Sequence, residues 1–466
     1  MKNPNAQPYL SLAIGALASA ALGTTAHAQS QDALLQKLVQ KGILTQQEAE
    51  NLRAEPTNAA PKSFLAKMAP LPDWITSFGI YGDMRGRFEQ HGSADPQSWE
   101  RDRFRYRLRI GTTLSFLDNF DVGVRLASGD PQFTASGKLV GGQSITANQT
   151  LGSLMTRKFI WLDAAYARWT PIRNETFTLD GVIGKMDQPF QLDNMVWDYD
   201  INPEGGALQA KYNLSDKHTL KANTAFFVLD EIANPIPGPP AVPTTQASHD
   251  PYVYGEQLLL ESKWTPKLES AIGVAVFDIV NRDGLNSKVQ PFYNAGNTYD
   301  PVTGTLKYNI NPIVTEGSLT YKLDSFPLYP GKFPIKLMGD YMENPAAPSN
   351  NRAFRAGVMF GKAAGKHTWE IGYRYQRLEA DSWLAGLVDD DNAAFYALGN
   401  PQLAGTGVAT GYFGGTNVKG HLIQLTYRFT DFLDFTFYGY FNDLVVNAPG
   451  LTSSSRHFYC DLNWRF

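Results

Sequence analysis

From about residue 74 to residue 466, apolar and polar positions alternate along the chain with a period of two. The clearest stretch is 103–110, where arginines at the odd positions alternate with Phe104, Tyr106, Leu108 and Ile110. A β-strand sends successive side chains to opposite faces, so this stretch predicts a strand with one cationic and one apolar face. The alternation returns at 80–88 and 457–466, which predicts strands at both ends of the region.

About sixteen segments share this pattern. We predict strands at 75–90, 99–116, 119–129, 157–170, 175–186, 205–214, 218–229, 254–265, 268–281, 307–323, 333–344, 353–363, 367–379, 417–429, 434–446 and 455–466. The sequence therefore predicts an all-β fold with about 16 strands over residues 74–466, and counts of 14 or 18 stay open.

The connections between these segments alternate in length. Tight turns at 117–119, 171–174, 215–217, 265–267 and 430–433 alternate with long segments near 130–156, 230–253, 282–306 and 380–416. Short turns on the periplasmic side and long loops outside are typical of outer-membrane barrels. We therefore expect a transmembrane antiparallel up-and-down β-barrel, in contact with outer-membrane lipid and lipopolysaccharide.

Composition supports a membrane wall rather than a soluble sandwich. Aromatic residues make up 12% of the chain, and charged residues only 18%, against about 25% in ordinary globular domains. The mean hydropathy is −0.28, which alone suggests a soluble protein. A wall that alternates apolar-out with polar-in has a mild mean hydropathy even though its lipid face is apolar. Its aromatic residues form girdles at the two membrane interfaces, which accounts for the high aromatic content.

The N-terminus resembles an export signal. Lys2 precedes an apolar stretch from about Leu10 to Leu22, and small residues lead to Ala26-His27-Ala28. This pattern predicts a cleaved signal peptide over 1–28; a short membrane anchor is the alternative, although the stretch is shorter than the ~20 residues a spanning helix needs. We expect a short periplasmic helical segment at 29–55 and an Ala/Pro-rich linker at 56–73.

Composition also limits the chemistry. The formal net charge is −4, which argues against nucleic acid as a partner, since phosphate contacts need a basic surface. Cys460 is the one cysteine, so we expect no disulfide within the chain, and we expect no metal site and no cofactor. No hydrolase or metalloprotease motif accompanies the 7 histidines, so we expect no enzyme activity.

An arginine ladder and an acidic segment are the candidate site. By strand phase, the inward basic set includes Lys211, Lys221, Arg355, Arg374 and Arg428, and seven arginines that crowd on the first three strands: Arg85, Arg87, Arg103, Arg105, Arg107, Arg109 and Arg125. Such crowding of like charge calls for acidic partners, and the segment near 187–204 supplies Asp187, Asp193, Asp198, Asp200 and Glu204. We expect it to be the third extracellular loop, folded into the barrel so that acids face arginines across a constriction, as charged rings do in other pores. An ordinary solvated loop is the alternative.

The carboxyl end carries a further pattern. Leu462, Trp464 and Phe466 lie at alternate positions. This arrangement resembles the signal read by the barrel-assembly machinery, which we expect as a partner.

Three motifs together carry a family resemblance: residues 34–45, the ladder at 103–110, and Gly184-Lys185-Met186 leading to Trp197-Asp198. In this order they resemble the "putative porin" family of proteobacterial outer-membrane proteins, and the chain looks related to phosphate-selective and general trimeric porins. The resemblance implies a 16-stranded barrel, a homotrimer and an inward third loop.

The expected function is passive diffusion of small hydrophilic solutes and ions through a water-filled channel, with a weak anion preference. The alternatives are a channel selective for an anion such as phosphate, and an adhesin or structural barrel without an open pore. A plugged transporter of about 22 strands would need a longer chain. Neither the natural solute nor the oligomeric state follows from the sequence.

Overall fold

The computed structural model describes residues 72, 74–93, 100–133, 137–232, 250–286, 296–392, 394, 415–447 and 454–466. The expected signal peptide (1–28) and helical segment (29–55) lie outside the described residues, as does all of the linker (56–73) except residue 72.

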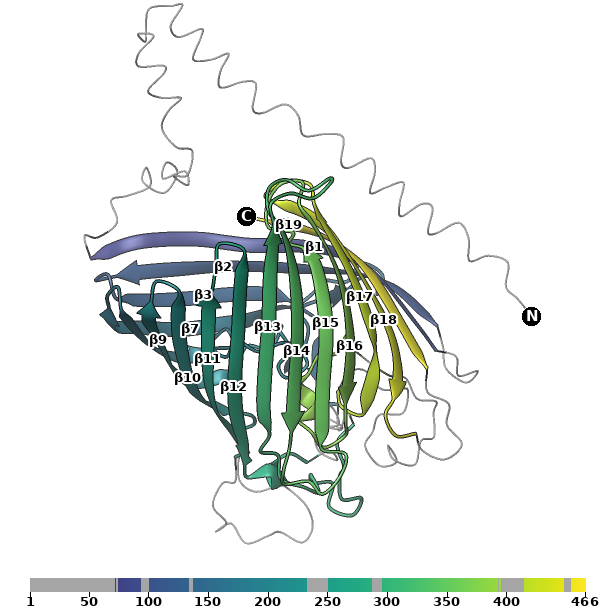
Figure 1. The fold of residues 1–466 in the computed structure, drawn as a ribbon. Helices are drawn as coiled ribbons and strands as arrows, with labels where there is room; N and C mark the ends of the chain where they lie inside the picture. The colour runs from purple at the N-terminus through teal and green to yellow at the C-terminus, as the bar shows by residue number, and fades with distance from the viewer. Residues whose placement is uncertain are drawn as a thin grey trace, which may run out of the picture. The chain divides into compact units, whose positions relative to one another are not determined.

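Sixteen strands form the wall of a barrel (Figure 1). They are β1 (Ile75–Ser93), β2 (Arg101–Phe116), β3 (Phe120–Ser128), β7 (Ile160–Arg173), β8 (Phe177–Lys185), β9 (Glu204–Ser215), β10 (His218–Val228), β11 (Tyr252–Lys263), β12 (Leu268–Val280), β13 (Ile313–Leu323), β14 (Phe333–Glu343), β15 (Arg352–Gly361), β16 (Trp369–Leu378), β17 (Val418–Arg428), β18 (Leu433–Leu444) and β19 (Ser455–Arg465).

Short elements occupy the connections. Between β3 and β7, β4 (Pro131–Phe133) pairs with β5 (Leu139–Gly142), and β6 (Gln149–Thr150) pairs with β2 over two residues. Two 3-10 turns, η2 (Arg282–Gly284) and η4 (Ala385–Leu387), follow β12 and β16. No helix among the described residues is both long and apolar enough to cross a membrane.

The wall is closed and antiparallel throughout. Each wall strand pairs with the next along the chain, and the last, β19, pairs with β1 from Asp83↔Arg465 to Ser93↔Ser455. Figure 1 shows β19 beside β1. The predicted antiparallel barrel of 16 strands is confirmed, and the alternative counts of 14 and 18 strands are wrong.

Most strand ends lie within three residues of the predicted ones, and two of the differences have a structural reason. β13 begins at Ile313 instead of 307, directly after Pro312, which has no N–H to donate to the ladder. β7 continues past Pro171 to Arg173, with a register shift between Trp169 and Ile172 against β8. Proline cannot donate to the ladder, and a shift of register is where a strand tolerates it.

The two faces of the wall differ as the period of two predicts. Ile80, Phe104 and Ile110 expose large apolar side chains on one face, whereas Arg87 and Arg105, at odd positions of the same strands, are buried. The exposed face is suited to hydrocarbon and the other points into the barrel.

Aromatic side chains form a row at the end of the barrel where the turns are short. Trp74 packs on Phe116, Phe116 stacks on Phe120, and Phe120 stacks on Trp169, with ring centroids 6.1, 5.6 and 6.2 Å apart. Such a row is typical of an aromatic girdle at a membrane interface.

The long connections lie at the opposite end, since the strands run alternately up and down. Two of them position the candidate site. We name residues 186–203, between β8 and β9, the third loop, and residues 379–417, between β16 and β17, the seventh loop; residues 393 and 395–414 of the latter lie outside the description.

Candidate functional site: a paired-charge zone inside the barrel

The third loop is held by apolar packing against the inner wall. Its Phe190 packs edge-on against Phe277 of β12, with ring centroids 5.1 Å apart, and Trp197 packs edge-on against Phe227 of β10 at 5.9 Å. All four side chains are buried. Burying a side chain of this size stabilises by roughly 1.5–3 kcal/mol, so the apolar contacts are a major part of the energy that holds the loop inside.

A glutamine on the wall fixes the start of the loop. Gln257 of β11 accepts a hydrogen bond from the backbone N–H of Gln191 at 3.0 Å and donates one to its carbonyl oxygen at 3.1 Å. Gln257 is buried, so both polar atoms of its amide need partners. The pair of bonds ties the loop backbone to the wall.

Two glycines form the base of the third loop. Gly184 of β8 and Gly205 of β9 are directly paired, with φ angles of +110° and +156°. A Cβ on Gly184 would lie 2.3 Å from the carbonyl oxygen of Ala165. Only glycine meets both conditions without strain, so this pair lets the chain leave the wall and turn inward.

The arginine ladder meets carboxylates that belong to the wall itself. Arg103 and Arg105 both donate to Glu89, and Arg107 and Arg109 share Asp83 at 2.9 and 2.7 Å. Other arginines of the set pair in the same way: Arg87 with Asp461 at 2.8 Å, Arg85 with Asp461 at 3.4 Å, and Arg125 with Asp163.

Three of the predicted loop acids also meet arginines. Asp187 pairs with Arg125 at 2.8 Å and Asp200 with Arg107 at 3.3 Å. Asp193 pairs with Arg355 of β15, which is outside the predicted ladder. The loop thus connects the first strands of the barrel with a strand from its second half.

The remaining two predicted acids lie elsewhere. Glu204 is the first residue of β9 and forms an exposed pair with Lys185 at 2.9 Å. Asp198 is buried and has no ion pair with an arginine among the described residues; its carboxylate accepts from the backbone N–H of Asp200 at 2.7 Å.

The seventh loop is the part of the site that the motifs did not indicate. It packs against the third loop: the backbone N–H of Asp198 donates to Leu387 at 2.8 Å, and Asn194 donates its side-chain amide to Asp389 at 2.7 Å. Asp391 pairs with Arg87 at 3.4 Å. The run Asp389-Asp390-Asp391 is the feature of the sequence that could have indicated this acidic loop. It lies within a long connection, where no strand phase shows which way a side chain points.

Three carboxyl groups of the two loops crowd together. Asp198, Asp389 and Asp390 place one oxygen each within 4.8 Å of one another. Burial raises the pKa of Asp389 to about 7, and the charge of Asp391 adds to the shift. Burial and the neighbouring carboxylates raise the pKa of Asp198 and of Asp390 well above the usual range as well. Within this cluster, Asp389 is therefore poised to change charge near neutral pH.

Charge in the ladder is close to balanced. The seven arginines of the predicted set lie in ion pairs with seven carboxylates, those of Asp83, Glu89, Asp163, Asp187, Asp200, Asp391 and Asp461. A row of guanidiniums paired in this way attracts anions less strongly than an unpaired row.

The residues of the predicted assembly signal lie at the closing seam. Leu462 and Trp464 lie on the outer face of β19. The backbone N–H of Phe466 donates a hydrogen bond to the carbonyl oxygen of Gly82 in β1 at 3.0 Å, and the Phe466 carbonyl oxygen accepts one from the Gly82 N–H at 2.9 Å. Recognition of these residues by an assembly machinery stays a prediction.

Comparison with known proteins shows a match to one protein family and a similarity of fold to several solved structures. Residues 94–309 match the family described as "putative porin", and no curated protein matches the chain. The fold is similar to Salmonella typhi OmpF (10% identity, 84% of this chain and 97% of that chain, TM-score 0.44). It is also similar to Pseudomonas putida OprB (9%, 84% and 94%, 0.47) and Acinetobacter baumannii OccAB4 (10%, 85% and 100%, 0.39).

Similarities this distant say nothing about solute or assembly. The family match includes the arginine ladder at 103–110 and the Gly184-Lys185-Met186 motif, whereas residues 34–45 lie outside it. The resemblance of this chain to the putative porin family is therefore confirmed.

Proposed function

We propose that the protein forms a water-filled channel in the outer membrane, through which small hydrophilic solutes and ions diffuse passively. The closed wall of 16 strands carries this proposal, because a barrel of that size is too wide for side chains alone to fill. An outer face of exposed apolar side chains supports a position in the membrane.

The constriction in this proposal lies where the third loop meets the ladder. Arg107 and Arg125 stand on one side, and Asp200 and Asp187 face them from the loop. Arg105 is the neighbouring member of the ladder on the same face of β2. Paired charges that line a narrow zone sort solutes by size, dipole and charge. The proposed anion preference is weak, because each guanidinium already has a carboxylate within reach.

Three parts of the proposal rest on the sequence rather than on the barrel. These are a cleaved signal peptide over 1–28, assembly through the barrel-assembly machinery, and a homotrimer, which the family resemblance implies. The proposal includes no enzymatic step, because the described residues of the site form charge pairs without an activated nucleophile.

Two alternatives each have an observation in their favour. The density of arginines on β1 to β3 favours a channel selective for an anion such as phosphate. The packing of the third loop against the seventh, with Trp197 and Trp383 fully buried, favours a structural or adhesive barrel without an open pore.

Planar-bilayer recording separates these candidates. Purified protein should give discrete ohmic conductance steps. In a salt gradient, its reversal potential should be small and should have the sign that indicates a preference for anions. Block of the current by inorganic phosphate at low concentration would favour the selective channel. The absence of conductance steps from correctly folded protein would contradict a channel.

A further inference from the structure

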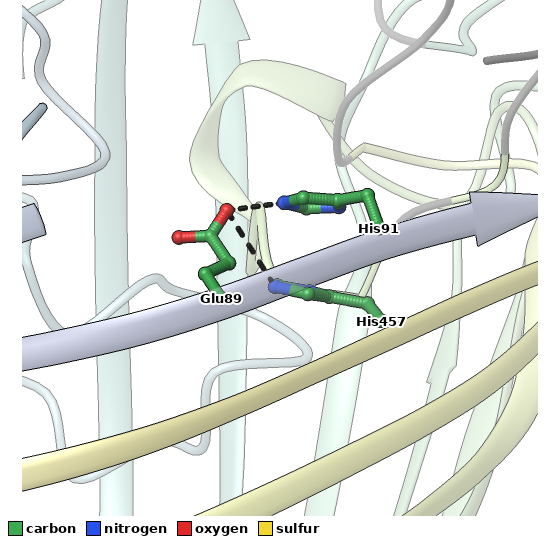
Figure 2. Close-up of side chains that lie close together, drawn as sticks. All are labelled: Glu89, His91 and His457. Carbon is green, nitrogen blue, oxygen red and sulfur yellow. Dashed lines mark hydrogen bonds and ion pairs between the residues drawn. The ribbon is translucent and has the colours of Figure 1, made fainter. Parts of the chain in front are cut away.

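A buried cluster beside the arginine ladder joins the first and last strands of the barrel wall. His91 of β1 and His457 of β19 are directly opposite in the register of the closing seam, and Glu89 precedes His91 by two positions, on the same face. Figure 2 shows the glutamate carboxylate facing both imidazole rings. The exposed fractions are 0% for Glu89, 4% for His91 and 1% for His457, so bulk water does not reach the cluster.

The tautomer of His457 is set by its surroundings. Its Nδ1 lies 3.0 Å from the backbone carbonyl oxygen of Asp391 in the seventh loop. A carbonyl oxygen only accepts, so Nδ1 carries the proton and, in the neutral ring, Nε2 presents a lone pair. A backbone carbonyl behind the ring is the arrangement that orients metal-binding histidines in proteins.

The lone pair of His457 points at another acceptor. Its Nε2 lies 3.7 Å from Oε1 of Glu89, and it has no hydrogen-bond partner among the described residues. Two buried acceptors that face each other are unfavourable unless a cation lies between them. The Nε2 atom of His91 contacts the same oxygen, so one nitrogen from each strand and one carboxylate oxygen converge, all within 4.8 Å.

From this convergence we propose that Glu89, His91 and His457 bind one divalent late transition-metal ion, of which Zn²⁺ is the representative, across the closing seam. Imidazole and carboxylate are ligands that Zn²⁺ accepts at about 2.0–2.2 Å. Ligand atoms on a tetrahedral ion then lie about 3.3–3.6 Å apart, close to the separation of His457 and Glu89. Small side-chain movements bring all three atoms to these distances and leave a fourth position for water.

Some charges around the cluster repel a bound cation and others attract it. Arg103 and Arg105 donate to Glu89, the latter to Oε2 at 3.3 Å, so they hold the carboxylate in place but repel a cation. Asp391, whose carboxylate lies 4.0 Å from His457, offsets part of that repulsion. The proposal departs from the expectation of no metal site, which came from motif spacing, because the two histidines lie near opposite ends of the barrel sequence.

Zinc titration of the full-length barrel, folded in detergent and free of a histidine tag, tests the proposal. The wild type should bind one Zn²⁺ per chain by calorimetry. His457→Asn removes Nε2 but keeps a donor where Nδ1 lies, so it should fold and bind zinc at least ~10-fold more weakly, since loss of even an outer partner costs 10–100-fold. His421→Ala, on the exposed face of β17, is the matched control and should bind as the wild type does.

The proposal fails if the wild type shows no saturable binding, or if His457→Asn binds zinc as tightly as the wild type. If His457→Asn does not fold, the calorimetric titration of the wild type with Zn²⁺ still tests the proposal. Co²⁺ should give the visible absorption of a low-coordinate nitrogen–oxygen site and be displaced by one equivalent of Zn²⁺, and absence of that spectrum overturns the assignment. Neither readout depends on conductance, so failure here and failure of the channel proposal are separate results.

Discussion

The indole N–H of Trp383 donates a hydrogen bond to the carbonyl oxygen of Val196 at 2.6 Å, and both residues are buried. This bond joins the seventh loop to the third. Neither loop is therefore positioned by the wall alone, and the proposed constriction depends on two segments that are distant in the chain.

Removing that bond should loosen both loops. Trp383→Phe keeps an aromatic ring but leaves the buried carbonyl of Val196 unpaired, which costs about 1–3 kcal/mol. We expect a lower denaturation midpoint and more current fluctuation in single-channel records. Trp264→Phe is the control, since that indole donates to Ser270 at an exposed turn. Equal behaviour of the two variants would mean that the loops do not depend on this bond.

Neutralising two arginines should change ion selectivity. Replacing Arg105 and Arg107 by glutamine leaves Glu89, Asp83 and Asp200 with fewer positive partners, so the reversal potential in a salt gradient should move toward cations. The control is the double change Lys267→Gln and Lys322→Gln, which removes the same charge near the turns. An unchanged reversal potential in the arginine variant would remove these residues from the proposed constriction.

Shortening the third loop should widen the channel. Deletion of 190–202 removes the packed segment, so single-channel conductance should rise. A control deletion of 153–156 removes a part of another connection in which Leu154 and Met155 are 99% exposed, and it should leave conductance unchanged. If the first deletion gives wild-type conductance in a folded barrel, the third loop does not limit the current.

Acidification should shift selectivity toward anions. The pKa of Asp389 is raised to about 7, so this carboxyl loses its negative charge as the pH falls from 8 to 6. Reversal potentials measured across this range should follow that loss, and Asp389→Asn should flatten the dependence. Asp324→Asn, at an exposed turn, should leave it intact. A pH profile in Asp389→Asn equal to that of the wild type would contradict this origin.

The same shift has a consequence for stability. The folded protein binds the proton of Asp389 more tightly than the unfolded chain does, since its usual pKa is 3.8. This contribution is fully present below about pH 4 and is lost as the pH rises to about 7. The stability gap between Asp389→Asn and the wild type should therefore grow between about pH 4 and pH 7 and stay constant above pH 7, as measured by denaturant midpoints.

A methyl group at the base of the third loop should be costly. Gly184→Ala combines a left-handed φ with a contact of 2.3 Å to the carbonyl oxygen of Ala165, so we expect a loss of roughly 1–3 kcal/mol. Gly181→Ala, on the same strand, meets Leu208 at an ordinary 3.6 Å and should cost much less. Equal denaturation midpoints for the two variants would show that the glycine conformation is not required.

The period of two along the chain was sufficient to predict the barrel, because a membrane wall imposes it on every strand. The arginine ladder was predictable for the same reason. Strand phase alone places Arg103 to Arg109 on one face, and the excess of positive charge pointed to an acidic partner.

The rest of the site depends on contacts that no local pattern encodes. Trp197 and Phe227 meet because the third loop turns inward at Gly184, and Asp391 reaches Arg87 only after β16 and β17 have joined the wall. His91 and His457 become neighbours only through closure. Local sequence constrains each element, but the pairing of distant loops follows from the closed topology.

Closure between β1 and β19 also sets the order of events during biogenesis. Arg87 and Asp461, bonded across this seam, are 374 positions apart. Until the final strand arrives, the first strand has an unsatisfied edge along its length, and open edges of this kind promote aggregation. The wall can thus become continuous only after β19 has been synthesised, so every earlier intermediate must be kept from pairing with other chains.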